Sequence, residues 1–105
     1  MNKNDLKKFT INNNLFDEEY YLRIYPHAKK SRLAPLEHFL KVGMELEYNP
    51  SLKFDNKIYK KMNQDVADAG INSYIHFFNH GMAENRIASK ADLISDDLKH
   101  IRETI

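Results

Sequence analysis

The sequence predicts an all-α protein: two tandem 38-residue helix-turn-helix units, packed as a small helical-repeat domain with N- and C-terminal capping helices. Three observations predict this fold. The chain repeats itself without a gap, at a constant offset that carries Phe16 onto Phe54. Its apolar residues recur at the i, i+3 and i+4 spacing of amphipathic helices, and no segment has the period-two pattern of a strand. We therefore expect residues 1–105 to form a single domain with one modest core.

The repeat is defined by residues that are identical at equivalent positions of the two units. Phe16-Asp17 recurs as Phe54-Asp55. The other identical positions are Tyr21 with Tyr59, His38-Phe39 with His76-Phe77, Gly43-Met44 with Gly81-Met82, and Ser51 with Ser89. The first unit covers about residues 16–51 and the second about 54–89. Stacked units of this size share a continuous core, so the ends need caps. We expect these in a helix from Asn4 to Thr10 and in one over about residues 93–104.

The first helix of each unit has a recognisable start. Asp17 and Asp55 are predicted N-caps, because a carboxylate can accept the unpaired amide hydrogens of a first helical turn. A Phe before the cap and a Tyr four residues after it are the two positions of a hydrophobic staple. The repeated Phe and Tyr therefore have a structural explanation that needs no ligand.

The two first helices are predicted to end differently. An inward apolar stripe is expected from Tyr21, Ile24, Tyr25 and Ala28. Pro26 should break the helix of the first unit near Tyr25. The second unit has no proline between Asp55 and Gly70, so a continuous helix is predicted there, stopped by a left-handed Gly70.

The second helix of each unit follows a turn. Pro35 is predicted at a first helical position, and Asn72 as the N-cap at the equivalent place. Gly43 and Gly81 are expected to end these helices. The core-facing residues should be Leu36, Phe39, Leu40, Tyr74, Phe77 and Phe78.

The repeated residues resemble a degenerate helical repeat of bacterial proteins. Its usual form reads FDxxYYLxxNPDVAxAGxNPLxHYLxxGxxEGRxPS, and residues 16–51 and 54–89 match it over about two-thirds of the chain. The second unit is closer, with Asn63-Gln64-Asp65-Val66-Ala67 in the middle of the pattern. The first unit departs there, with Tyr25-Pro26-His27-Ala28. Such repeats accompany large glycosyltransferases of bacterial surface-polysaccharide assembly and some large secreted proteins. The resemblance implies an accessory, non-catalytic segment.

Composition narrows the function classes. Sixteen basic and fifteen acidic residues leave a formal net charge of +1, so no global field favours nucleic acid or an anionic membrane. The chain contains no cysteine, which removes disulfides and thiolate zinc sites and fits a reducing compartment. No window approaches the length of a membrane span, and the first residues lack a signal-peptide pattern. We expect a cytoplasmic protein.

Catalytic and metal-binding sites are not expected. His76 and His80 lie four residues apart on a predicted helix, with His38 as a conceivable third ligand. His80 corresponds to Val42 in the first unit, however, so a histidine bonded to a backbone carbonyl explains the repeated positions better. The acidic pairs Glu18-Glu19, Glu45 with Glu47, and Asp96-Asp97 are typical of solvated helix surfaces. The sequence thus predicts no enzyme, no cofactor and no metal.

Three binding hypotheses follow. The leading one is a protein-interaction or scaffold module that presents the groove between stacked units to a partner. The alternative is binding of nucleic acid or an anionic ligand through basic residues near exposed parts of Tyr25 and Tyr59. These basic residues are Lys29, Lys30, Arg32, Lys57, Lys60 and Lys61. A third hypothesis is a homodimer through the C-terminal helix, with an apolar stripe of Ile94, Leu98, Ile101 and Ile105.

Overall fold

The chain folds into helices joined by turns and loops, as the sequence predicted. A computed structural model describes residues 2–104, and the side chains of residues 2–99. Within residues 2–104 the only β-structure is an isolated bridge between Ser51 and Phe54. The elements in order are α1 (Lys3–Asn12), α2 (Glu18–Ile24), the 3₁₀ helix η1 (Pro26–Lys30), α3 (Pro35–His38), η2 (Phe39–Gly43), α4 (Asn56–Met62), α5 (Gln64–Ala69), α6 (Ser73–His76), η3 (Phe77–Gly81) and α7 (Lys90–Thr104). The all-α fold is confirmed.

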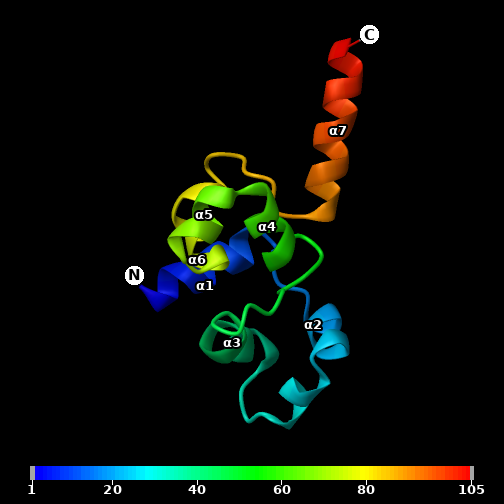
Figure 1. The fold of residues 1–105 in the computed structure, drawn as a ribbon. Coiled ribbons are helices and arrows are strands. Elements are labelled where there is room, and N and C mark those ends of the chain that lie inside the picture. The colour runs from blue at the N-terminus through cyan, green and yellow to red at the C-terminus, as the bar shows by residue number, and fades with distance from the viewer. Residues whose placement is uncertain (1, 105) are drawn as a thin grey trace.

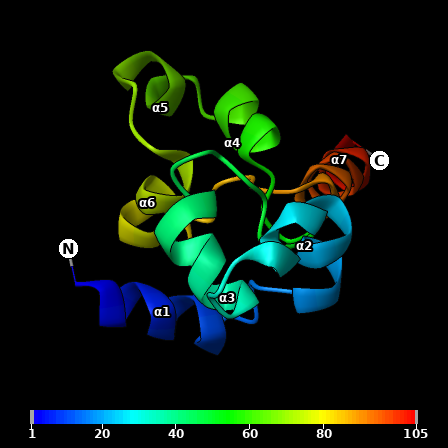
Figure 2. The same cartoon turned by 90° about the horizontal axis from the view of Figure 1, so that it is seen from below.

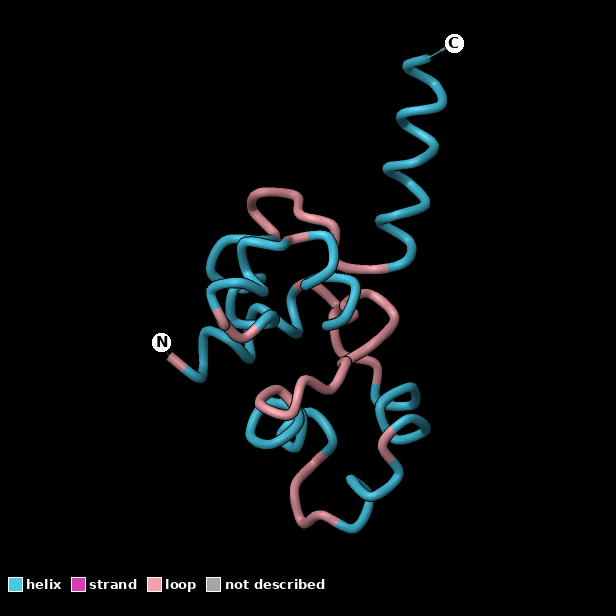
Figure 3. The backbone as a smooth tube through the Cα atoms, in the orientation of Figure 1, coloured by secondary structure: helices cyan, strands magenta, loops and turns pink. Residues whose placement is uncertain are grey.

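The helices form a body from which α7 projects (Figure 1). The body contains α1 to η3, and its two groups of helices, α2–η2 and α4–η3, lie on either side of the connecting loop. The connectors over residues 44–55 and 82–89 follow the second helix of each unit (Figure 3). The view from below shows α1 beside α3 and α6 (Figure 2).

The predicted helix starts are confirmed in both units. The Asp17 carboxylate accepts a hydrogen bond from the amide of Tyr20 at 3.0 Å. Asp55 accepts from the amide of Lys57 at 2.9 Å and from the next amide at 3.0 Å. The Phe16 and Tyr21 rings lie 5.2 Å apart, and the rings of Phe54 and Tyr59 lie 5.3 Å apart. Cap and staple therefore act together at each start.

Both first helices break at the same place. In the first unit α2 ends at Ile24 and Pro26 opens η1, as predicted. The predicted continuous helix from Asp55 to Gly70 is wrong, because α4 ends at Met62 and α5 begins at Gln64. Asn63 causes this break: its side-chain amide donates to the Tyr59 carbonyl at 2.8 Å, the acceptor that its own backbone amide would use in a continuing helix. The predicted left-handed stop at Gly70 is confirmed, with φ of 67°.

The inward stripe of the first helix is only partly as predicted. Tyr21 and Ala28 are buried and Tyr25 is half-buried. Ile24 is 48% exposed, which contradicts the prediction. The buried face passes from Tyr21 in α2 to Ala28 in η1 without including Ile24, because the chain changes from an α-helix to a 3₁₀ helix between them.

The second helices begin as predicted and then widen. Pro35 is the first residue of α3, and the Asn72 side chain accepts from the Ile75 amide at 3.1 Å at the start of α6. From Phe39 and Phe77 onward the turns are of the π type and end at Gly43 and Gly81. Each is followed by a residue in the left-handed region four positions later: Glu47 at φ of 61° and Asn85 at φ of 54°.

One buried cluster joins the units. Its members are Leu6, Leu15, Tyr21, Ala28, Phe39, Met44, Phe54, Tyr59, Val66, Tyr74, Phe77 and Ala88. The predicted core residues Leu36, Leu40 and Phe78 are half-buried, and Leu40 and Phe78 pack against the cluster. Burial of so many aromatic side chains is the main apolar contribution to the stability of this chain.

The two terminal helices lie differently against the body. The predicted N-terminal helix is confirmed, and α1 packs on the second unit through Phe9, whose ring is 5.0 Å from that of Phe78. The predicted C-terminal helix is present as α7, in which Ile94 and Leu98 are each 52% exposed. The side chains of Ile101 and Ile105 lie outside the described residues. No helix among the described residues combines the length and apolar character needed to cross a membrane.

Candidate functional site

The repeated tyrosines, histidines and glycines form one structural cluster in each unit. The Tyr21 hydroxyl and Nδ1 of His38 share a hydrogen bond of 2.7 Å. The Tyr59 hydroxyl and Nδ1 of His76 share one of the same length. A Cβ atom on the glycine of the same unit, Gly43 or Gly81, would overlap that hydroxyl. The glycine is therefore needed where the tyrosine tip meets the helix backbone.

This geometry corrects the predicted role of the histidines. The partner of each imidazole is a tyrosine hydroxyl, not a backbone carbonyl. Burial lowers the pKa of His38, with a smaller effect of His27. Burial also lowers the pKa of His76, helped by the positive charge of Arg86. Burial raises the pKa of Tyr59 to about 12. Both clusters are thus neutral hydrogen-bonded pairs near pH 7, with a structural role.

The other candidate polar residues do not converge on one site. The rings of His76 and His80 lie 5.4 Å apart. Within the described residues, however, no three His, Asp or Glu side chains gather so that they could hold a metal ion. Glu18 and Glu19 lie in the first turn of α2, and Glu47 pairs with Lys60.

The predicted basic residues lie on separate surface elements. Lys29 and Lys30 belong to η1, and Arg32 follows it; Lys57, Lys60 and Lys61 belong to α4. The expectation that they flank exposed tyrosine rings is wrong for Tyr59, which is 0% exposed. Tyr25 is half-buried because its ring stacks on that of Tyr48, with 4.0 Å between centroids.

Arg86 forms an ionic cluster that the sequence did not indicate. Its guanidinium donates to Asp65 at 2.8 Å, to Glu84 at 3.0 Å and to the side-chain oxygen of Asn63 at 3.3 Å. The bond from Arg86 holds the pKa of the Asp65 carboxyl below its ordinary range. The cluster ties the turn after η3 to the break between α4 and α5.

The first unit receives the second through a defined surface. The Phe39 ring meets the Tyr74 ring edge-on at 5.2 Å, and the Met44 carbonyl accepts from the Asn72 side chain at 3.1 Å. The side-chain amide of Asn56, in the second unit, makes three further hydrogen bonds to the first unit. Its acceptors are the carbonyl of Glu47 at 3.1 Å, the carbonyl of Tyr48 at 3.1 Å and the side-chain oxygen of Asn49 at 2.8 Å. Five residues of the first unit thus contact the second.

The same five positions of the second unit line an open groove. Phe39, Met44, Glu47, Tyr48 and Asn49 correspond in the repeat to Phe77, Met82, Asn85, Arg86 and Ile87. All five of these later residues line a cavity of about 900 Å³. We call this cavity the α7 groove. Its apolar lining residues are Leu15, Leu52, Phe77, Met82, Ile87 and Leu98.

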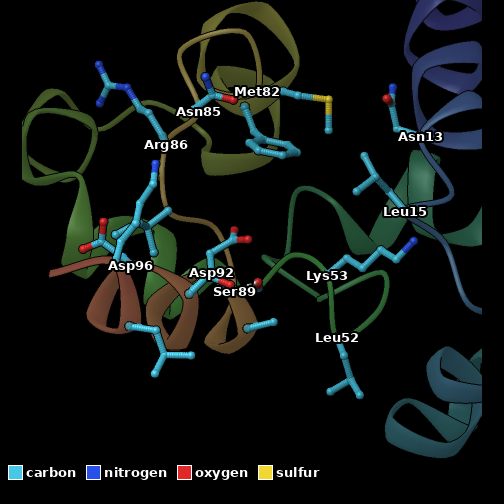
Figure 4. A pocket seen from close by; sticks show the side chains of 16 residues that line it. Asn13, Leu15, Leu52, Lys53, Met82, Asn85, Arg86, Ser89, Asp92 and Asp96 are labelled. Atoms are coloured by element: carbon cyan, nitrogen blue, oxygen red, sulfur yellow. Dashed lines mark hydrogen bonds between the residues drawn. The ribbon is translucent and has the colours of Figure 1, made fainter. Parts of the chain in front are cut away.

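The walls of the α7 groove come from four parts of the chain, one of which is the segment after α1 that carries Asn13 and Leu15 (Figure 4). The turn that carries Met82, Asn85 and Arg86 lies on one side, and α7 lies opposite with Asp92 and Asp96. Leu52 and Lys53, from the connector between the units, lie at one end. An apolar floor with charged residues of both signs at the rim suits an amphipathic helix.

The repeat indicates where this groove lies. It is a different surface from the groove between units that the sequence predicted. A repeat in which one unit docks on the previous unit leaves the equivalent surface of the last unit uncovered. Transferring each contact residue of the first unit to its equivalent in the second unit identifies that surface from the sequence, once the contacts are known.

Comparison with known proteins adds no relative: no family model, no curated protein and no solved structure matches this chain.

Proposed function

We propose that this chain is a non-catalytic helical interaction module that offers the α7 groove to a helical partner. The observation that supports the proposal is the correspondence between the groove and the surface on which the first unit receives the second. A surface of this kind inside the chain already holds a helical unit, so its uncovered equivalent has the shape and chemistry for another helix.

The contacts of the repeated polar residues are consistent with this proposal. His38 and His76 are bonded to tyrosines within the core clusters, and Asp17 and Asp55 cap helices. These residues are accounted for by folding. The groove in contrast combines solvent-exposed apolar residues, such as Leu52 at 77% and Leu98 at 52% exposure, with a charged rim. Exposed apolar residues gathered at a groove are typical of interaction sites.

The sequence resemblance suggests a setting for the module. Residues 16–51 and 54–89 resemble repeats that accompany glycosyltransferases of bacterial surface-polysaccharide assembly. We therefore propose that the module works in the bacterial cytoplasm as an accessory segment of such a system, holding enzymes or assembly factors without acting on sugars itself.

Affinity purification with a groove variant tests the proposal. The tagged chain, a Leu52→Glu variant and a Leu46→Glu control would be used to recover partners from native cells. Leu46 is 58% exposed and does not line the groove. The same partner should be recovered with the wild type and the control, in low and in high salt, and be lost with Leu52→Glu. Equal recovery of the partner with the wild type and both variants would contradict the proposal. Glycosyl transfer by the isolated chain would also contradict it.

The alternative function is binding of nucleic acid or another anionic ligand. It is supported by the exposure of Lys29, Lys30, Arg32, Lys57 and Lys61, which provides two basic surface regions. Because phosphate contacts release counterions, such binding would weaken steeply as salt rises from about 50 to about 200 mM. A titration with labelled RNA and with a double Lys29→Glu, Lys30→Glu variant separates this function from the leading one. Salt-independent or absent binding would exclude it.

A further inference from the structure

Two surfaces of this chain, a groove and a projecting helix, lack a partner and have complementary character. The α7 groove contains the equivalent of an internal docking surface, open except at Phe77, which is buried against Phe9, and α7 is a projecting helix with exposed apolar residues. We propose that α7 of a second copy occupies the α7 groove, antiparallel to the first α7, so that a twofold symmetric dimer forms. This inference rests on the proposed function and names its partner as the chain itself.

Stacking of a second copy's first unit into the groove is the competing arrangement, and its chemistry is unfavourable. Inside the chain the docking side chains are Asn72, Asn56 and Tyr74, two of which donate amide hydrogen bonds. The corresponding residues of the first unit are Ala34, Glu18 and Leu36. Ala34 has no polar group, and the Glu18 carboxylate cannot donate to the carbonyls of the 82–87 turn. Those carbonyls would lose water without gaining a partner.

An α7 helix instead matches the apolar part of the groove, because it brings apolar side chains and its own backbone hydrogen bonds are made within the helix. Ile94 and Leu98 lie one turn apart on α7 and are each 52% exposed. Leu98 also lines the groove, so the exposed residues of α7 continue directly into the apolar lining around Leu52. A second α7 placed there would cover Leu52 and Leu98 in both copies at once, as an isologous interface requires.

The charges on α7 favour the antiparallel direction. By sequence, residues 90–97 carry three aspartates and one lysine, and residues 98–104 carry Lys99 and Arg102 against Glu103. Lys53 lies at one end of the groove, and Arg86, which already pairs with Asp65 and Glu84, lies on the wall opposite α7. An antiparallel partner brings the acidic first half of one helix beside the second half of the other. It also sets the positive end of each helix dipole near the negative end of its neighbour.

The oligomeric state of the full chain tests the dimer. Sedimentation equilibrium over a concentration series would measure the dissociation constant of the wild type, of Leu98→Glu, of Leu52→Glu and of the Leu46→Glu control. Each groove substitution should weaken the dimer by at least about tenfold, because a charge replaces a buried leucine. The control should leave it unchanged. All three leucines are more than half exposed, so the variants should keep their fold.

A cross-linking experiment tests the direction of the helices. The chain has no cysteine, so each single cysteine variant gives an unambiguous product. Leu98→Cys should form a disulfide-linked dimer on mild oxidation, because a twofold axis near residue 98 brings its two copies together. Ala91→Cys should not, because the two copies of residue 91 would be separated by about 14 residues of helix, or roughly 21 Å. Cross-linking of both variants would indicate a parallel pair and overturn the proposal.

The outcomes separate this inference from the proposed function. A monomer at every concentration, or a dimer that neither groove substitution weakens, would overturn the inference. In either case, recovery of another protein by the wild type but not by Leu52→Glu would leave the proposed interaction function standing.

Discussion

The Tyr21 hydroxyl lies 2.7 Å from Nδ1 of His38. The same contact at the same distance recurs in the second unit between Tyr59 and His76. Each pair lies against a glycine that ends the second helix of its unit. This contact joins the first helix of a unit to its second. It explains why Tyr, His and Gly repeat together at fixed positions.

A methyl group at Gly43 should disrupt this cluster. In Gly43→Ala the new Cβ overlaps the Tyr21 hydroxyl, so the helices must separate at a cost of about 1–3 kcal/mol in the free energy of unfolding. Urea denaturation measures this loss.

A double variant tests the cause of that loss. Tyr21→Phe removes the hydroxyl that the new methyl group meets, so Gly43→Ala should cost less in the Tyr21→Phe background. Equal costs in both backgrounds would show that the clash is not with the hydroxyl.

Acid should destabilise the fold through buried His38 and half-buried His76. Burial lowers the pKa of His38 and His76 below the ordinary 6.5. The unfolded chain therefore binds more protons than the folded chain just below that pH. The stability that these residues contribute should be fully present above about pH 6.5 and fall as the pH drops below it. Urea denaturation at pH 7.5 and 5.5 measures the difference.

Histidine variants test whether His38 and His76 cause the loss of stability in acid. A double His38→Gln, His76→Gln variant should lose less stability between pH 7.5 and 5.5 than the wild type. His80→Gln is the comparison, since His80 is exposed; it should keep most of the acid sensitivity, because burial lowers the pKa of His76 more than His80 does. If the double variant retains the full acid loss, other groups cause it.

Asn63 should contribute strongly to stability although it interrupts a helix. It is 8% exposed, and its amide donates to the carbonyls of Tyr59 at 2.8 Å and Ile87 at 3.1 Å. Asn63→Ala leaves these carbonyls without that donor and should cost about 1–3 kcal/mol by thermal or urea denaturation. Gln64→Ala, at the exposed neighbouring position, should change stability little. If Asn63→Ala instead stabilised the chain, the bonds of Asn63 would not contribute to stability, and its effect would be only to prevent a continuous helix.

Asn72 should couple the two units. Its side-chain oxygen caps α6 by accepting from Ile75, and its amide donates to the Met44 carbonyl. Asn72→Asp keeps the cap but loses the donor, whereas Asn72→Ala loses both. Hydrogen exchange should show faster opening between the units in both variants and a frayed α6 start only in Asn72→Ala. Identical exchange in the two variants would contradict this division of roles.

The local patterns predicted most of the helix starts. Asp17, Asp55 and Asn72 cap helices, Pro35 opens one, and Gly70 ends one, as their residue types indicated. These features depend on a few neighbouring residues, so periodicity and cap chemistry reveal them. The absence of proline did not predict the break at Asn63, because that break depends on a side-chain bond to the Tyr59 carbonyl and on a second bond to Ile87, which meets Asn63 only in the folded chain.

The sequence by itself determined the helical class, the correspondence between the residues of the two units and the lack of cysteine chemistry. Tertiary structure alone decided which repeated residues meet. It placed each histidine on a tyrosine hydroxyl, exposed Ile24, and left the 82–87 turn uncovered beside α7. The physical reason is that helix propensity and capping act within a turn or two. Hydrogen bonds, burial and grooves instead depend on segments that only folding brings together.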